Sequence, residues 1–308
     1  MKKYLLVSIC ILMLLVITAC NEGNAETSVS STGDLAANST ESNTNKNAQY
    51  ILLKKTSTTT EDNITVQTAY EYDEKGRLIK EYGFMNDSPF SVTTIIYDEN
   101  GNKIEEKIVR NKRPTIWEKF EYTTDGLMLN CIDYDNDGNK IFWTSFEYDQ
   151  NGKMLSEINY DANDILTDKH IYSYEEDDIC TKNTYDKDGN IKKINKTTYD
   201  KNGNVLNIIT SNAQDTIINE EYNIYDENGN LTLSSGKSYG NPSLKSVYEY
   251  NNDGKIIKCS HEDFYNNRKT FMKYEYDELG NLIKESKIDE CGITTYTAEY
   301  EYSEFIPD

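Results

Sequence analysis

From Tyr50 onward, apolar and polar positions alternate over short stretches that end in turn-forming residues. In Tyr70-Glu71-Tyr72 the two aromatic side chains fall on one side of an extended backbone and the glutamate on the other. Turn signals recur every 12 to 14 residues, which leaves room for strands of about 7 to 9 residues. After Tyr50 the apolar residues do not show the periodicity of about 3.6 residues that is typical of an α-helix. The pattern predicts a succession of antiparallel β-hairpins.

A unit of 25 or 26 residues repeats throughout this region. Residues 70–79 and 274–283 share most of their sequence, although they lie near opposite ends of the repeat region. Weaker turn signals fall halfway between the main ones, so each unit supplies two strands. The main turn positions are Gly76, Gly101, Gly126, Gly152, Asp178, Gly203, Gly229, Gly254 and Gly280.

Each main turn has the chemistry of a bulged hairpin. An aspartate such as Asp73 or Asp277 opens the turn, where its short carboxylate can accept backbone N–H bonds. The glycine three residues later can adopt the positive φ that ends a type I turn of this kind. Leucine or isoleucine resumes the apolar pattern two or three residues after the glycine.

The expected fold class is all-β: a repetitive antiparallel β-hairpin meander of about 18–20 strands. Because an open sheet of that size must bend, we expect a curled or superhelical open sheet. Tyrosine ladders and cross-strand pairs, at about 0.2–1 kcal/mol per pair, would stabilise it in place of a Leu- and Val-rich core.

The start of the chain has the features of an export signal. Lys2 and Lys3 precede an almost wholly apolar run over residues 4–17, which is short of the roughly 20 residues of a membrane span. We expect a signal helix over residues 1–19. Ile17-Thr18-Ala19-Cys20 resembles the bacterial lipobox. The resemblance implies that Cys20 is acylated and anchors the protein to the outer face of the cytoplasmic membrane.

Composition divides the remaining chain into a linker at residues 20–49 and a repeat domain at residues 50–308. The linker is rich in Ser, Thr and Asn and has no aromatic residue before Tyr50, so we expect it to be disordered. The whole chain carries a net charge of −21 and has 25 tyrosines. Such a charge would repel a phosphate backbone, which argues against nucleic acid as a partner.

The unit Tyr-x-Tyr-Asp-x-x-Gly, followed by Asn, Arg or Lys and then Leu or Ile, resembles the YD repeat of Rhs-type proteins and teneurins. The resemblance extends from about Tyr50 to Tyr302, over nine units in phase. It implies a β-hairpin ribbon that can wind into a shell, and a cell-surface role in binding or encapsulation. We find no clear counterpart of the core region that closes an Rhs shell, so an open coiled sheet is expected.

One acid-rich turn is a candidate calcium site. Asp133, Asp135 and Asp137 with Gly138 match the first half of a D-x-D-x-D-G calcium loop. The twelfth position is Thr144, where such a loop carries glutamate, and no helices are expected beside it. An acid-rich repeat turn without metal is the alternative, and no other cofactor is expected.

Trp117 and Trp143 each lie nine residues before a turn glycine, so they occupy the same position in adjacent repeats. In the two-residue alternation they fall on the same side as Glu121 and Glu147 rather than on the side of the tyrosine ladder. We therefore expect both tryptophans on the polar face, two strands apart, at a separation of roughly 10 Å. Two exposed indoles could stack on a glycan or a peptide. A bulge that turned both into the core is the alternative.

The sequence contains no sign of an enzyme. A G-x-S-x-G elbow, a phosphate-binding glycine loop and H-E-x-x-H are absent, and His170 and His261 accompany no nucleophile motif. Without C-x-x-C, neither a zinc site nor a thioredoxin-like motif is predicted. Buried free thiols are expected at four cysteines, with a disulfide as the alternative: Cys131, Cys180, Cys259 and Cys291.

These observations predict a non-enzymatic, lipid-anchored surface protein whose repeats bind carbohydrate or protein. Two alternatives remain: a structural spacer or envelope component without a dedicated ligand, and a remnant of an Rhs-like toxin-encapsulating shell. An exposed aromatic pair favours the first, uniform acidic faces the second, and a closed cavity with convergent carboxylates the third.

Overall fold

The computed structural model describes residues 49–60, 62–175 and 178–305. The expected signal helix and all of the expected linker before Gln49 lie outside these ranges. The described part contains no helix, and hence none long and apolar enough to cross a membrane. The first described strand, β1, starts at Gln49.

The described chain folds into 20 strands, and each pairs in antiparallel fashion with the next, so the predicted hairpin meander is confirmed. The strands are β1 (Gln49–Thr59), β2 (Ile64–Tyr72), β3 (Leu78–Met85), β4 (Ser88–Tyr97), β5 (Lys103–Arg110), β6 (Ile116–Tyr122), β7 (Met128–Tyr134), β8 (Lys140–Tyr148), β9 (Met154–Asp161), β10 (Leu166–Glu175), β11 (Ile179–Asp186), β12 (Ile191–Tyr199), β13 (Val205–Ser211), β14 (Ile217–Tyr225), β15 (Leu231–Ser238), β16 (Asn241–Tyr250), β17 (Ile256–Asp263), β18 (Arg268–Tyr276), β19 (Leu282–Asp289) and β20 (Thr294–Phe305).

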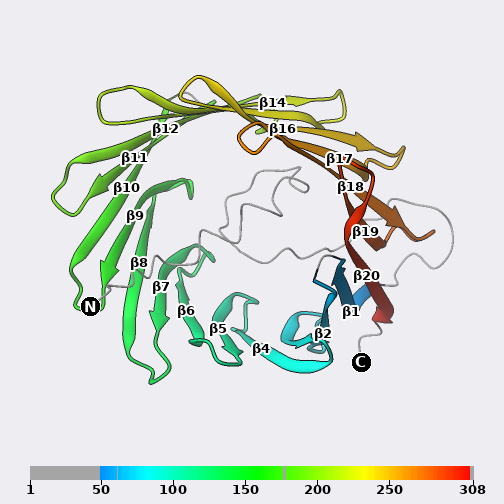
Figure 1. The fold of residues 1–308 in the computed structure, drawn as a ribbon. Helices are drawn as coiled ribbons and strands as arrows, with labels where there is room; N and C mark the ends of the chain where they lie inside the picture. Colours follow the sequence, from blue (N-terminus) through cyan, green and yellow to red (C-terminus); the bar gives the residue numbers. More distant parts are fainter. Residues whose placement is uncertain (1–48, 61, 176–177, 306–308) are drawn as a thin grey trace.

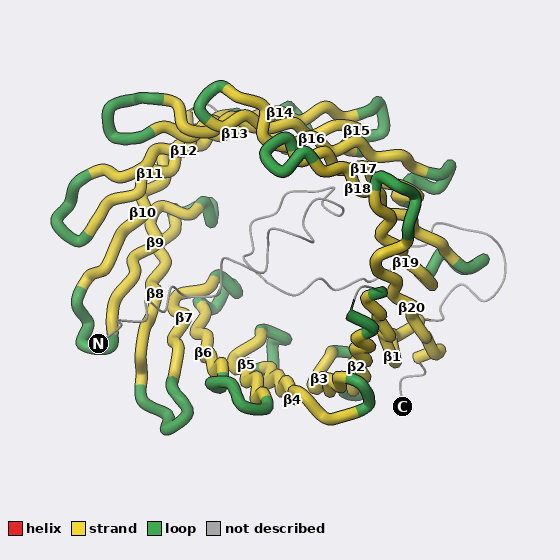
Figure 2. Tube along the Cα trace, in the orientation of Figure 1, coloured by secondary structure: helices red, strands yellow, loops and turns green. Residues whose placement is uncertain are grey.

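The predicted open sheet is wrong, because the meander closes into a barrel (Figures 1 and 2). The two terminal strands pair with each other from Gln49↔Phe305 to Thr59↔Tyr296, with one bulge near Leu52. They are also the longest strands, with 11 residues in β1 and 12 in β20. Closure removes the two free edges that an open sheet would expose to other chains.

The hairpin turns form two rims that differ in sequence. One rim, named here the glycine-turn rim, carries the turns from Gly76 to Gly280 that the repeat predicted; at the eight glycines φ lies between 75° and 93°. In the first turn, the Asp73 carboxylate accepts the backbone N–H groups of Lys75 and Arg77, both at 2.9 Å. Because Gln49 pairs with Phe305, the start of β1 and the end of β20 also lie at this rim. The intermediate turns form the opposite rim.

The barrel wall has two chemically distinct faces. Residues paired across antiparallel strands share a face, so the register assigns Tyr70 and Glu81 to one face and Glu71 and Lys80 to the other. We name them the tyrosine face and the charged face. Within the described ranges, the few buried hydrophobic residues all lie on the tyrosine face: Ile95, Tyr248, Cys259, Ala298 and Tyr300.

The second tyrosine of the Tyr-x-Tyr motif joins neighbouring hairpins. Tyr97, the last residue of β4, donates its hydroxyl to the carbonyl of Leu78, the first residue of β3, at 2.9 Å. Tyr276 makes the equivalent bond to Ile256 at 2.8 Å. Eight of these bonds, 2.7 to 3.0 Å long, recur around the glycine-turn rim, and their donors are Tyr72, Tyr97, Tyr122, Tyr174, Tyr225, Tyr250, Tyr276 and Tyr302.

Candidate functional site

Four aromatic side chains lie side by side on the charged face. Trp117 on β6 is opposite Tyr134 on β7, and Trp143 on β8 is opposite Tyr160 on β9. We name these four residues the aromatic patch. The two tryptophans therefore occupy the face and the strand spacing that their repeat positions predict, with one strand between them.

The rings of the aromatic patch pack in pairs. Trp143 stacks on Tyr160 with 4.2 Å between ring centroids and 11° between planes. Trp117 and Tyr134 are tilted by 39° at 5.2 Å. All four residues are half-buried rather than exposed, because each indole is covered by the tyrosine of the next strand. Such pairs contribute about 0.5–1.5 kcal/mol beyond the burial of their area.

Charged side chains orient the two indoles. The Nε1–H group of Trp117 donates to Glu105 Oε1 at 3.0 Å, and that of Trp143 donates to Asp164 Oδ1 at 2.8 Å. Lysine ammonium groups lie 3.9 to 5.4 Å from the indole centroids, within the range of cation–π attraction, and they belong to Lys107, Lys119 and Lys140. The rings are thus held in place and bordered by groups that can exchange hydrogen bonds with a polar ligand.

The aromatic patch lies toward the opposite rim. Tyr134 is the last residue of β7, which runs toward that rim, and Trp117 is the second residue of β6, which starts there. Asp164 belongs to the turn between β9 and β10 at the same rim. The patch is therefore displaced from the rim at which the chain enters β1.

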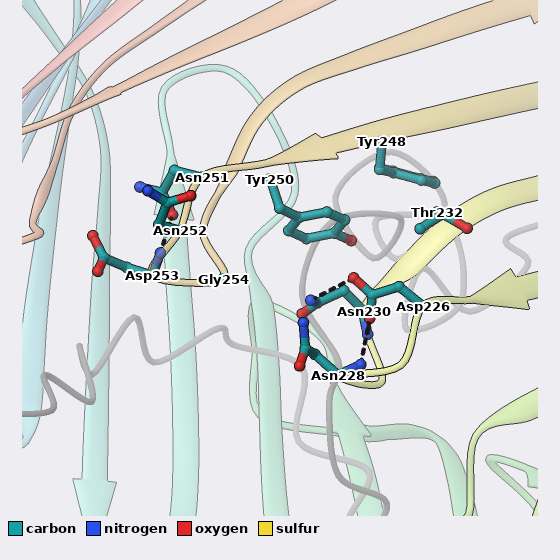
Figure 3. Close-up of a pocket in the computed structure, with 10 residues that line it drawn as sticks. All are labelled: Asp226, Asn228, Asn230, Thr232, Tyr248, Tyr250, Asn251, Asn252, Asp253 and Gly254. Atoms are coloured by element: carbon teal, nitrogen blue, oxygen red, sulfur yellow. Dashed lines mark hydrogen bonds between the residues drawn. The ribbon is translucent and has the colours of Figure 1, made fainter.

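Shallow grooves separate successive hairpins at the glycine-turn rim. Figure 3 shows one of about 680 Å³ between the turns at 226–230 and 251–254. An equivalent groove of about 660 Å³ lies between the turns at 123–127 and 149–152. The polar groups in the first groove serve the fold: the Asp226 carboxylate accepts three bonds within its own turn, and the Tyr250 hydroxyl donates to Leu231. These grooves arise from the repeat itself.

The structure does not bring the three predicted calcium ligands together. The Asp135 carboxylate accepts N–H groups of Asp137 and Asn139 at 2.9 and 2.8 Å. The hydrogen bond from the Asn139 side-chain amide, followed by these backbone bonds, lowers the pKa of Asp135. Asp133 instead points to the tyrosine face, where it is opposite Glu118 and Phe142. The three aspartates therefore divide between a turn and a strand face.

Asp133 belongs to a different cluster of metal-ligating groups. One ligand atom each from Glu118, Cys131 and Asp133 lies within 4.8 Å of the other two. Burial, followed by the nearby charge of Glu118, raises the pKa of Asp133 to about 7. Sequence spacing could not reveal this cluster, because its members come from two strands that only the hairpin register aligns.

One of the two histidines lies beside a cysteine, and the other lies beside a threonine. His170 Nδ1 lies 3.0 Å from Thr184 Oγ1, and His261 lies 3.3 Å from the sulfur of Cys259. Burial lowers the pKa of both imidazoles. Cys259 is completely buried, so a substrate has no direct access to the Cys–His pair. All four cysteines of the described ranges are free thiols, although only Cys259 is buried and Cys291 is exposed.

This chain has distant likenesses among known proteins. No protein-family model and no curated protein matches the chain. Among solved structures, a porin-like protein from Bacteroides uniformis is 13% identical with a TM-score of 0.38, covering 81% of this chain and 96% of that chain. A porin-like protein from Bacteroides vulgatus is 11% identical with a TM-score of 0.32, covering 82% and 98%.

A further solved structure, TcdB2-TccC3 without its hypervariable C-terminal region, is 13% identical with a TM-score of 0.33. The match covers 79% of this chain, but only 16% of that chain. At these identities and scores, none of the three likenesses assigns a family or a function to the chain.

Proposed function

We propose that this chain is a lipid-anchored, extracytoplasmic barrel that binds a carbohydrate at the aromatic patch and performs no catalysis. The observation that carries the proposal is the alignment of Trp117, Tyr134, Trp143 and Tyr160 on four adjacent strands of one face. Aromatic faces pack against the apolar C–H faces of sugars, and bordering carboxylates and ammonium groups exchange hydrogen bonds with hydroxyls.

The charge of the chain favours an uncharged glycan as the ligand. At a net charge of −21, long-range repulsion slows the approach of polyanions. Two of the three lysines beside the indoles have their charge offset by a carboxylate, because Lys119 pairs with Glu105 at 3.6 Å and Lys140 pairs with Asp164. A neutral sugar avoids the repulsion and can still use these groups.

The chain enters the barrel at the rim opposite to the one near the proposed binding site. Acylation of Cys20 would tether the chain through the residues that lead to Gln49, and Gln49 lies at the glycine-turn rim. The aromatic patch lies toward the opposite rim. A tether at one rim would therefore present the patch away from the membrane surface.

Glycan-array screening of the purified protein, followed by titration of a hit, tests the proposal. The two tryptophans are the only ones in the chain, so intrinsic fluorescence reports directly on the patch. Trp143→Ala should weaken binding about 2- to 10-fold, the equivalent of one stacking contact of about 0.5–1.5 kcal/mol.

Tyr82→Ala is the matched control. Tyr82 lies on the charged face, donates to Glu71 at 2.8 Å and has Lys80 over its ring, but it belongs to β3, outside the patch. Equal affinities for Trp143→Ala and wild type would refute the binding site. A protein that binds no glycan would favour the structural spacer instead.

A further inference from the structure

The tyrosine face carries a second cluster directly behind the aromatic patch, on the same strands β6 and β7. Glu118 and Asp133 are opposite each other in the register, and Cys131 lies two residues before Asp133 on the same face. One ligand atom from each residue falls within 4.8 Å of the other two. A thiol and two carboxylates are thus already gathered at metal-binding distances.

Two carboxyl groups of this arrangement are directly opposite each other across β6 and β7. Like charges directly opposite each other destabilise a sheet, and Glu106 on β5 is in turn opposite Glu118. Lys103 lies 2.6 Å from Glu106. No lysine or arginine of the described ranges forms an ion pair with Asp133.

Asp133 also has an oxygen atom that nothing in the described chain satisfies. Its Oδ1 is closed off from solvent and has no hydrogen-bond partner among the described residues. A buried acceptor without a partner costs about 1–3 kcal/mol. The same carboxylate supplies a ligand atom to the cluster with Glu118 and Cys131, so a cation bound there would lie next to this oxygen.

We propose that Glu118, Cys131 and Asp133 bind a thiophilic divalent cation, with zinc as the best fit. A thiolate favours zinc over calcium or magnesium, which prefer oxygen ligands alone. Zinc takes cysteine and carboxylate ligands in tetrahedral geometry, and three protein ligands leave one position for water. The cation would clamp β6 to β7 and offset the repulsion between Glu118 and Asp133.

Cobalt(II), a spectroscopic substitute for zinc, tests this site in the purified full-length chain. A cobalt–thiolate bond produces a sulfur-to-metal charge-transfer band, which added zinc should abolish by displacement. Cys131→Ser should remove the band, whereas Cys180→Ser should retain it, because Cys180 is a half-buried thiol on the tyrosine face of β11, far from the cluster in sequence.

Asp133→Asn and Glu118→Gln keep the shape of each side chain, so they test the site even if the Cys131→Ser variant misfolds. Each should weaken cobalt binding by at least about tenfold, the cost found even for outer-shell partners of metal sites. A wild-type protein without the band, or a band that persists in Cys131→Ser, overturns the proposal. Trp143→Ala should leave the band unchanged, so failure of the glycan site and failure of the metal site are distinguishable.

Discussion

The tyrosine bonds between hairpins allow a direct test of what stabilises a barrel with so few buried aliphatic residues. Tyr276→Phe removes only the hydroxyl that donates to Ile256 at 2.8 Å, and the ring keeps its place beside Lys255. Tyr148 occupies the equivalent position on β8, yet its hydroxyl makes no hydrogen bond within the described residues. Tyr148→Phe is therefore the matched control.

The expected magnitude follows from the loss of one hydrogen bond. Tyr276→Phe should lower the free energy of unfolding by about 0.5–1.5 kcal/mol, which corresponds to a fall in Tm of about 1–6 °C for a domain of this size. Tyr148→Phe should change it by less than about 0.5 kcal/mol, because it breaks no bond. Replacing Tyr97, Tyr225 and Tyr276 together should give nearly additive losses, since their sites are far apart.

Urea denaturation followed by circular dichroism, with thermal melts as a second measurement, provides the assay. The m-value should stay constant, because the substitution exposes no additional surface on unfolding. Equal losses in Tyr276→Phe and Tyr148→Phe would refute the reasoning, because the bond to the carbonyl, which Tyr276 makes and Tyr148 does not, could then not explain the effect.

Three further predictions concern turns, pH and anchoring. Gly280 and Gly229 have φ of 85° and 84°, so alanine at either position should lower the free energy of unfolding, measured in urea, by about 1–2 kcal/mol. Gly280→Ala should lower it more than Gly229→Ala, because the new Cβ would displace Lys255; equal losses would contradict this. Burial raises the pKa of Tyr122 to about 12, so the neutral phenol should contribute fully to the stability of the folded state below pH ~10, and this contribution should be lost between about pH 10 and 12. A urea denaturation midpoint that stays constant over that range would contradict this prediction. Cys20→Ser should abolish incorporation of labelled palmitate in a bacterial host, and labelling that persists would exclude Cys20 as the anchor.

The local structure of the repeat domain was predictable because each turn carries its own chemistry. The aspartate that opens a turn accepts backbone N–H groups, and the glycine three residues later supplies the positive φ, as the turn from Asp73 to Gly76 illustrates. Two-residue alternation then places Trp117 and Trp143 on the face opposite the tyrosine ladder. These features depend on contacts within four residues or on strand geometry, so the sequence states them directly.

Closure and the side-chain clusters were decided by tertiary structure. Nothing within a repeat states whether β1 and β20 meet, because that depends on small twist and bend angles summed over 20 strands. Likewise, the pairing of Trp143 with Tyr160, and of Glu118 with Asp133, depends on a register that joins residues 15 to 17 positions apart. The sequence by itself determined the hairpins and their faces, through short-range turn chemistry; only the folded barrel decided which side chains meet, because those contacts are set by long-range pairing.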